Sequence, residues 1–438
     1  MARFLIGTVP AVGHVNPALP IARKLVERGH EVWWYTGKLF QPKIEATGAC
    51  YVPMNKGLDA SDFENLPKSL WEQREKLKGF AQFKYDIKTF MIDPTVSQMQ
   101  DYVDILRSFP ADVLLSDSFF LAGGWVSEQQ SLPYAEFSTS VLAVGSRDTA
   151  PFGLGFTPNA SKLGHLRNDV LNWILQRVLL RDVINHTNDI RASVGLLPHN
   201  KIFFDKISPF LYLQGTVPSF EYPRSDLPPQ VHFVGPFLSS SPTDFIPPAW
   251  WDDLKAGKPV IHVTQGTVSA NPNDLIVPTL QALAHEDVLV IATTGGYPIE
   301  NIKLQEYPTN ARIEPFIPHF HLLPHVDIMI TNGGYNAVQM ALANGVSLVV
   351  AGKTEDKPEV GARVEWSGVG INLKTKTPAP AKIKDAVKKI LSSYHYRQKA
   401  KSIGDEISHY DAPTNAATLL EQLAETKQPV LRSPKSSY

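Results

Sequence analysis

The chain has 438 residues, of which 43% are hydrophobic and 19% are charged, and its formal net charge is −1. This length suits two domains of roughly 200 residues each, and the composition excludes an intrinsically disordered chain. Because the charges give no basic excess, we expect no nucleic-acid partner.

Three features of the sequence predict a soluble, cytoplasmic protein. The single cysteine, Cys50, excludes an internal disulfide and a cysteine metal cluster, and it suits a reducing compartment. The apolar start is interrupted at Gly7 and Pro10, too early for the core of a signal peptide. No stretch approaches the ~18 unbroken apolar residues of a membrane span, so we expect no stable membrane anchor.

The first half of the chain alternates between strand and helix patterns. Residues 3–7 form an apolar segment, residues 18–26 repeat apolar side chains at helical spacing, and Gly29 ends that helix. Residues 31–35 predict a second strand, so this is a strand–helix–strand unit of a parallel sheet. Further strands are predicted at residues 112–115 and 133–138, and mostly helical, aromatic-rich segments at residues 57–108 and 145–200.

The second half repeats the alternation after a stretch dense in proline. Residues 221–250 have the proline content that is typical of a surface linker between domains. Strands are predicted at residues 259–264, 288–293, 326–331, 346–350 and 369–373, and helices at 274–285, 334–343 and within 380–424. The whole pattern predicts an α/β protein with two Rossmann-like, doubly wound parallel sheets that face each other across a cleft.

Two glycine turns follow strands of the second half. Asn332, Gly333 and Gly334 stand between a strand and a helix, where free amides and the positive end of the helix dipole can hold an anion. Gly266 and Thr267 follow another strand and could add amides and a hydroxyl. One such turn is equally well explained as a tight strand–helix connection, but two in one domain favour an anion site.

Two polar groups could carry chemistry. His14 follows the first strand, and a neutral histidine is the usual general base when a carboxylate orients its other nitrogen. Asp117 ends a parallel strand and is the best-placed carboxylate, although a lone histidine is more often structural. Acidic residues in the loop 353–357 could accept hydrogen bonds from sugar hydroxyls, with a solvated loop as the simpler interpretation.

Longer stretches of the sequence resemble glycosyltransferase family one, whose fold is called GT-B. The most specific stretch runs from Phe316 through Asn336 and continues at residues 355–358, and it is similar to the family's donor-binding signature. Gly13-His14 and residues 234–236 match as well. The resemblance implies an acceptor-binding domain at residues 1–220, a linker at 221–250, a donor-binding domain at 251–405, a helix at 406–424 that crosses back to the first domain, and a flexible tail at 425–438.

The resemblance implies a role for each matching position. His14 corresponds to the catalytic base and Asp117 to its acidic partner. Phe316 would flank the nucleotide base, and Asp356 and Lys357 would grip the sugar. The phosphates would meet Asn332, Gly333, Gly334 and Asn336, with Thr267 on the facing loop, and Gly13, Ile317 and His319 complete the expected donor site.

Four positions depart from the family's usual residues. Asn332 replaces a histidine and Ala337 replaces a serine, so backbone amides would carry more of the phosphate binding. Lys357 replaces a glutamine that touches the sugar, and Phe316 replaces the tryptophan of the plant enzymes. The nucleotide and the sugar are therefore less defined by the sequence than the reaction type.

The reaction implied by the resemblance is an inverting, single-displacement transfer. Glucose from UDP-glucose would pass to a hydroxyl of a small lipophilic acceptor such as a flavonoid or a polyketide. No cofactor and no metal are expected, because the chain has no Asp-x-Asp pair of the kind that holds a metal on the diphosphate in transferases of the other main fold. We expect a monomer or a weak dimer. The candidates for lining the acceptor pocket are Phe80, Phe83, Phe90 and Trp173, although core packing is the simpler explanation for each of them.

Other functions remain as alternatives. A dTDP-deoxysugar transferase, a nucleotide-sugar epimerase or a lipid-linked cell-wall transferase would use the same fold. A non-catalytic partner protein would keep the fold without the chemistry, and the presence of both His14 and Asp117 argues against it. A nicotinamide dehydrogenase is disfavoured because the first loop lacks Gly-x-Gly-x-x-Gly.

Overall fold

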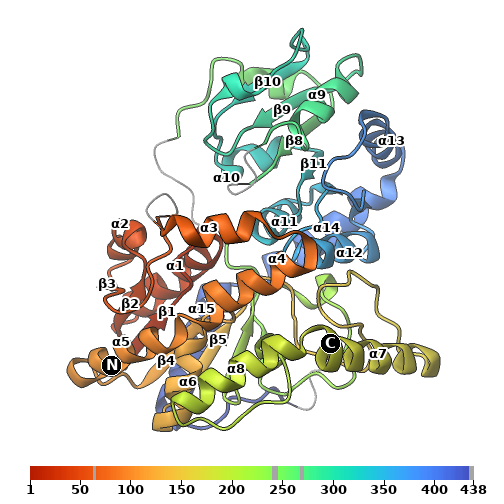
Figure 1. The fold of residues 1–438 in the computed structure, drawn as a ribbon. Coiled ribbons are helices and arrows are strands. Elements are labelled where there is room, and N and C mark those ends of the chain that lie inside the picture. The colour runs from red at the N-terminus through yellow and green to blue at the C-terminus, as the bar shows by residue number, and fades with distance from the viewer. Residues whose placement is uncertain (63–65, 239–244, 267–270, 434–438) are drawn as a thin grey trace.

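The computed structural model describes residues 1–62, 66–238, 245–266 and 271–433. It contains two parallel sheets, one in each half of the chain, with helices packed on their faces (Figure 1). Both sheets are doubly wound, as the sequence predicted. Among the described residues, no helix combines the length and the apolar character that crossing a bilayer requires.

The first sheet has the strand order β3-β2-β1-β4-β5-β6-β7. Its strands are β1 (Arg3–Gly7), β2 (Glu31–Thr36), β3 (Cys50–Pro53), β4 (Val113–Asp117), β5 (Tyr134–Phe137), β6 (Leu211–Gln214) and β7 (Val231–Phe233). Phe4, Leu5 and Ile6 of the central strand β1 are fully buried, as expected where helices cover both faces of a parallel sheet. The order reverses between β1 and β4, which is where ligand crevices open in such sheets.

The second sheet follows the same plan, in the order β10-β9-β8-β11-β12-β13. Its strands are β8 (Val260–Thr264), β9 (Leu289–Thr293), β10 (Ala311–Glu314), β11 (Ile328–Thr331), β12 (Ser347–Val350) and β13 (Gly370–Asn372). The reversal lies between β8 and β11, whose neighbouring ends are Thr264 and Thr331. Loops that follow these two strands therefore emerge side by side.

Helices surround both sheets. In the first half these are α1 (Val12–Glu27), α2 (Gln41–Glu45), α3 (Lys68–Glu75), α4 (Gly79–Asp86), α5 (Thr95–Ser108), α6 (Leu121–Gln130), α7 (Lys162–Ile174) and α8 (Arg181–Ser193), with π-helical turns η3 (Ile87–Ile92) and η4 (Leu175–Leu179). In the second half they are α9 (Ile276–Leu283), α10 (His319–Leu322), α11 (Tyr335–Ala343), α12 (Lys357–Trp366), α13 (Pro380–Leu391), α14 (Tyr394–Ser408) and α15 (Ala412–Thr426).

The start of α1 differs from the prediction. The sequence indicated a loop through Pro17, but the helix already begins at Val12 and runs through both Pro17 and Pro20. Proline removes an amide donor and normally disfavours a helix interior. Here Val15, Pro17 and Ile21 are buried against the sheet, so tertiary packing outweighs that cost. His14 consequently stands in the first turn of a helix.

Two boundary predictions were also wrong. The expected linker at residues 221–250 contains β7, which pairs in parallel with β6 and closes the first sheet. The expected flexible tail is held as far as residue 432: the Val430 amide donates to Phe210 O (2.9 Å), and the Arg432 amide donates to Pro229 O (2.8 Å). The proline-rich composition of residues 221–250 and the polar C-terminal segment gave no indication of these backbone contacts.

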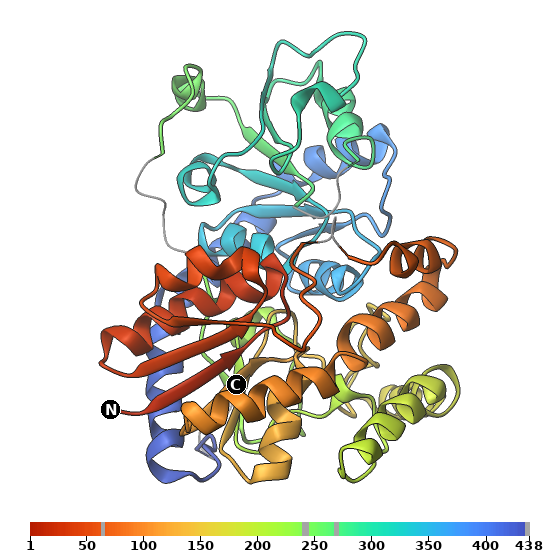
Figure 2. The same cartoon turned by 60° about the vertical axis from the view of Figure 1, so that its left-hand side comes forward.

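Helix α15 belongs to the core of the first sheet. Its buried residues Ala416 and Leu420 share one apolar cluster with Ile21 of α1 and with residues of β1. At its surface, Arg28 and His30 both bind the Glu421 carboxylate, each at 2.7 Å. Figure 2 shows this blue helix beside the red elements of the first half, so the end of the chain crosses back over the beginning.

A buried ion pair joins the two halves. The Arg363 guanidinium of α12 donates to Glu221 Oε1 (Nη2 at 2.5 Å, Nε at 2.9 Å) and to Glu359 Oε2 (3.0 Å). It also lies 4.0 Å from the centre of the Tyr222 ring. Burial alone would raise the pKa of Glu221, but Arg363 and Arg224 hold that pKa below its ordinary value. The pair is therefore ionised and fastens α12 to the first half.

Replacing Arg363→Met should destabilise the protein by about 3–5 kcal/mol, because it leaves the Glu221 carboxylate buried without its main partner. The measurement is the urea midpoint of unfolding. The matched control is Lys255→Met, which breaks an exposed pair with Asp252 and should change stability by less than about 1 kcal/mol. Equal midpoints for the two variants would contradict the structural importance of the buried pair.

Candidate active site

His14 and Asp117 meet at the carboxyl edge of the first sheet. The imidazole Nδ1 lies 2.9 Å from Asp117 Oδ1, and Asp117 is fully buried at the end of β4. The backbone amides of Val9 (2.7 Å, to Oδ2) and Phe119 (2.9 Å, to Oδ1) also donate to this carboxylate. Both of its oxygens are therefore fixed, and the carboxylate holds the imidazole in one orientation.

The electrostatics of His14 suit a base. Burial alone would lower its pKa, but the Asp117 charge and hydrogen bond raise the pKa above the ordinary 6.5, with a smaller contribution from Asp356. Because Nδ1 faces a carboxylate, we assign the proton of the neutral ring to Nδ1, which leaves the lone pair on Nε2. The Phe119 ring packs edge-on against the imidazole with centroids 5.7 Å apart.

The predicted anion loop lies between β11 and α11. Gly333 has a φ of 89°, and a Cβ there would come within 2.8 Å of Val350. Asn332 ties the turn together, because its Nδ2 donates to Gln265 O and its Oδ1 accepts from the Gly334 amide (3.2 Å). The loops after β8 and β11 are thus joined through one side chain.

The first turn of α11 supplies free amides. Gly334 is the N-cap residue and provides no side-chain cap. In any α-helix the first amides lack partners within the helix and carry the positive end of the dipole. The amides of Tyr335, Asn336 and Ala337 therefore point out of the helix start, and the half-buried Asn336 stands among them. This arrangement is a ready site for a phosphate group.

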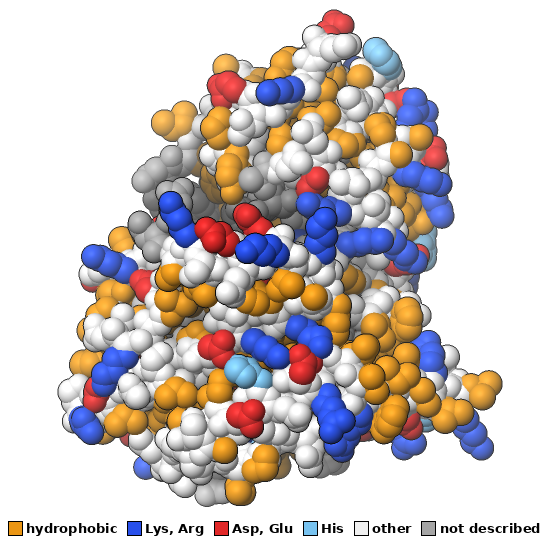
Figure 3. All heavy atoms as spheres, in the orientation of Figure 1, with side chains coloured by type: hydrophobic (Ala, Val, Ile, Leu, Met, Phe, Trp, Pro, Cys, Tyr) orange, Lys and Arg blue, Asp and Glu red, His pale blue; other side chains and the backbone are white. Residues whose placement is uncertain are grey.

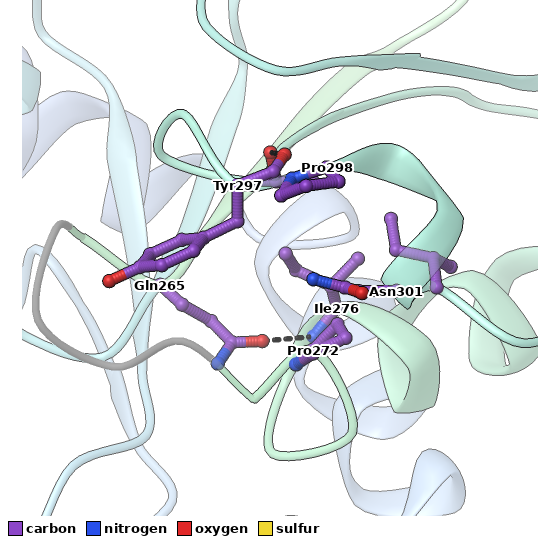
Figure 4. A pocket seen from close by; sticks show the side chains of 8 residues that line it. Gln265, Pro272, Ile276, Tyr297, Pro298 and Asn301 are labelled. Atoms are coloured by element: carbon purple, nitrogen blue, oxygen red, sulfur yellow. Dashed lines mark hydrogen bonds between the residues drawn. The ribbon is translucent and has the colours of Figure 1, made fainter.

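A shallow surface hollow opens near the ends of β8 and β9. Gln265, Tyr297 and Asn301 are among the residues that line it (Figure 4). The Gln265 side chain accepts from the Ile276 amide at the start of α9 (3.0 Å), which holds the loop after β8 against that helix. The predicted Thr267 lies outside the described residues.

Asp356 and Lys357 begin α12, on the loop after β12. The Ser140 hydroxyl, from the loop after β5, donates to Asp356 Oδ2 and thereby connects the two halves of the site. Burial raises the pKa of Asp356. The Lys357 ammonium group pairs with the Glu355 carboxylate, and burial lowers the pKa of Lys357 to about 8. Asp356 also lies near enough to His14 to contribute to its raised pKa.

The remaining donor candidates differ in their surroundings. Phe316 is 66% exposed and free to stack on a ligand, whereas Ile317 is 2% exposed and packs in the core of the second half. The His319 ring lies against His262, with their Nε2 atoms 3.3 Å apart, and burial lowers the pKa of His319 to about 4. Gly13 is exposed in the first turn of α1 with open space around it. The buried Ile317 side chain thus contributes to packing.

The four aromatic acceptor candidates do not form one pocket. Phe80 and Phe83 stack on each other along α4, with centroids 5.8 Å apart, and Phe90 packs beside Trp71. Trp173 is 62% exposed on α7. It belongs to an apolar stripe with Leu163, Leu166 and Val170, seen as an orange patch at the lower right of Figure 3. Aromatic content alone did not reveal which face of each helix points inward.

Sequence reasoning missed two residues of the site. Phe119 packs on His14, and its signal was present in the Ser-Asp-Ser-Phe segment, two positions after Asp117. Ser140 of the first half binds Asp356 of the second, and no local pattern in the sequence indicated this contact. Within the described ranges, no group of three or more His, Cys, Asp and Glu side chains is arranged to hold a metal ion.

The contact between His14 and Asp117 gives a prediction that can be tested without a ligand. Asp117→Asn should lower the pKa of His14, because it removes the charge that opposes the effect of burial. An NMR titration of the imidazole carbon-bound protons measures this pKa. As a control, Asp93→Asn removes the carboxylate that binds the exposed His186 and should leave the His14 titration unchanged. A rise in the His14 pKa in Asp117→Asn would refute this electrostatic description.

Comparison with known proteins agrees with this geometry. Residues 277–423 match the family model described as erythromycin biosynthesis protein CIII-like, C-terminal domain. The chain is 49% identical over 425 residues to 4'-demethylrebeccamycin synthase of Lentzea aerocolonigenes, covering 96% of this chain and 99% of that protein. It is 32% identical to UDP-glycosyltransferase 2 of Phaeomoniella chlamydospora, covering 96% and 95% of the two chains.

Solved structures share the fold. The calicheamicin glycosyltransferase CalG4 superposes with a TM-score of 0.75 at 21% identity, over 98% of this chain and all of that one. The full-length identity to a glycosyltransferase relative, together with two facing doubly wound sheets, shows the family. The chain belongs to glycosyltransferase family one and is a glycosyltransferase with the GT-B fold.

Proposed function

We propose that the protein transfers a hexose, with inversion, from a nucleoside diphosphate sugar to a hydroxyl of a small lipophilic natural product. UDP-glucose is the first candidate donor, and a dTDP-sugar is the alternative. The observation that carries the proposal is the buried His14–Asp117 pair, to which Asp356 of the other half is brought close. The relation to a UDP-glycosyltransferase and to a demethylrebeccamycin synthase supports this class of donor and acceptor.

His14 acts as the general base of this reaction. Its Nε2 takes the proton of the acceptor hydroxyl while that oxygen forms a bond to the anomeric carbon of the sugar. The bond from this carbon to the diphosphate oxygen breaks on the opposite face, and its electron pair leaves with the nucleoside diphosphate. Asp117 stabilises the imidazolium that forms, and such a base contributes about 10²–10⁴-fold in rate.

The leaving diphosphate is held by the start of α11. Free amides there, with the helix dipole, meet the charge that develops as the bond breaks. Preorganised donors of this kind are worth about 3–4 kcal/mol each in comparable transition states. The scheme needs no metal and no cofactor, and we propose that the reaction takes place in the cytoplasm.

The sugar lies between the two halves in this proposal. Asp356 accepts hydrogen bonds from sugar hydroxyls, and its contact with Ser140 aims the carboxylate toward the first half. Lys357, already paired with Glu355, donates to a sugar oxygen where relatives of the family carry a glutamine. Phe316 offers an exposed ring to the nucleotide base.

His14→Ala should lower the rate of transfer from UDP-glucose to a phenolic acceptor by about 10²–10⁴-fold, because it removes the base. Binding of UDP, measured by thermal shift, should be unchanged. The exposed variant His186→Ala is the matched control and should retain full activity. Full activity of His14→Ala would overturn the assignment of the base, and the absence of a thermal shift with any UDP- or dTDP-sugar in the wild-type protein would favour a non-catalytic role.

Asn332→Ala should weaken UDP binding by about twofold to tenfold, because two hydrogen bonds that fix the phosphate loop are lost. Isothermal titration calorimetry provides the dissociation constant. Asn344→Ala changes an exposed asparagine at the other end of α11 and should leave UDP affinity unchanged. Unchanged affinity in Asn332→Ala would show that the turn does not contact the diphosphate.

A further inference from the structure

Helix α7 and the turn η4 that continues it carry an apolar face that no described residue covers. Leu163, Leu166 and Trp173 are 79%, 61% and 62% exposed, and Val170 and Val178 are 48% and 58% exposed. Residues three and four positions apart share one face of a helix, so these side chains form a continuous stripe. We call the surface made by these five residues the α7 face.

The opposite side of the same helix is packed against the first half. Gly164 and Asn168 of α7 and Leu175 of η4 are buried, and Asn168 Nδ2 donates to Arg147 O (2.9 Å). The α7 face therefore points outward from a helix that is firmly attached. Figure 1 shows α7 at the outer edge of the first half, and Figure 3 shows orange side chains protruding there. Soluble proteins seldom expose so many large apolar side chains together, and such patches usually mark an interaction surface.

Positive charges accompany the α7 face. Arg177 stands within the stripe, Arg181 follows one turn later at the start of α8, and Lys162 stands at the start of α7. All three side chains are exposed, and none of them is paired with a carboxylate of the described residues. The only acidic residue of the segment 162–181 is Asp169, at the margin of the face. The surface thus combines large apolar side chains with unpaired positive charge.

These charges distinguish between possible partners. A second copy of the chain that docked through the same face would bring two sets of unpaired cations together, which costs free energy. An anionic lipid bilayer instead offers acyl chains to the apolar side chains and headgroup phosphates to the arginines. Helices that lie in the surface of a bilayer combine leucine, an aromatic residue and basic residues in this way, with tryptophan at the level of the headgroups.

We propose that the α7 face docks reversibly on the surface of an anionic lipid bilayer. The stripe around Trp173 enters the boundary between headgroups and acyl chains, while Arg177 and Arg181 extend to the headgroup phosphates. Docking of this kind is superficial and needs no membrane-spanning helix. It brings the protein to the phase in which lipophilic compounds dissolve. The inference goes beyond the proposed function, and it is tested without a sugar donor or an acceptor.

The test sediments the full-length protein with vesicles of equal parts phosphatidylglycerol and phosphatidylcholine. Binding should be about tenfold or more tighter than to phosphatidylcholine alone, and it should weaken as salt is raised. Arg177→Gln/Arg181→Gln should bind the anionic vesicles about 25-fold more weakly, because each arginine near such a surface contributes about fivefold. The control Lys382→Gln/Lys389→Gln makes the same change in net charge at exposed positions of α13 and should bind as the wild-type protein does.

A second pair of variants tests the apolar part of the surface. Leu166→Ser/Trp173→Ser should lower the partition coefficient on anionic vesicles by about tenfold or more, because these side chains no longer enter the lipid. Leu391→Ser/Tyr394→Ser removes a leucine and an aromatic ring that are exposed elsewhere, on α13 and α14, and should leave the partition coefficient unchanged. Thermal unfolding verifies that each variant is folded.

The docking surface would be overturned if the wild-type protein did not bind anionic vesicles, or if Leu166→Ser/Trp173→Ser bound them equally well. A loss of binding in the lysine control as large as in the arginine variant would also overturn it, because the attraction would then not belong to the α7 face. A wild-type dimer in sedimentation velocity that Leu166→Ser/Trp173→Ser converts to a monomer would assign the face to a second copy instead. Sugar transfer is measured separately, so a failure of the proposed function leaves these outcomes unaffected.

Discussion

The attachment of α12 to the first half is the constraint on which the site depends. Arg363 is fixed by Glu221, and Glu359 of the same helix accepts hydrogen bonds from the amides of Gly153 and Gly155 in the first half. Helix α12 carries the buried Arg363 and starts directly after Asp356, so its attachment also determines the position of Asp356. The position of Asp356 relative to His14 is therefore set in part by the contacts of Arg363 and Glu359 with the first half.

The two halves divide the chemistry according to their topology. Each sheet reverses its strand order once, and the segments at that reversal carry the candidate functional groups: Asp117 and His14 in one sheet, the glycine turn of Asn332 in the other. The first half supplies a carboxylate with both oxygens fixed, and the second supplies unpaired amides. The proposed proton acceptor and the proposed anion site thus belong to two different sheets.

Much of this arrangement could be predicted from the sequence, because neighbouring parallel strands end at the same edge of a sheet. Asp117 ends a strand beside the one that precedes His14, so their proximity follows from the strand pattern. The contact of Ser140 with Asp356 could not be predicted, since it depends on how two halves dock. The strands β3, β6, β7 and β10 were missed because they are short or proline-flanked. The exposure of Trp173 was missed because composition does not identify a helix face.

The course of the chain after α14 has a consequence for how the protein is made. Helix α15 completes the apolar cluster around α1 and β1, and Val430 and Arg432 then bind the backbone beside β6 and β7. The first half is therefore discontinuous in sequence, and its core stays incomplete on the ribosome until the second half has been synthesised. A fragment that stops before α15 would leave the outer face of α1 uncovered and open to association with other nascent chains.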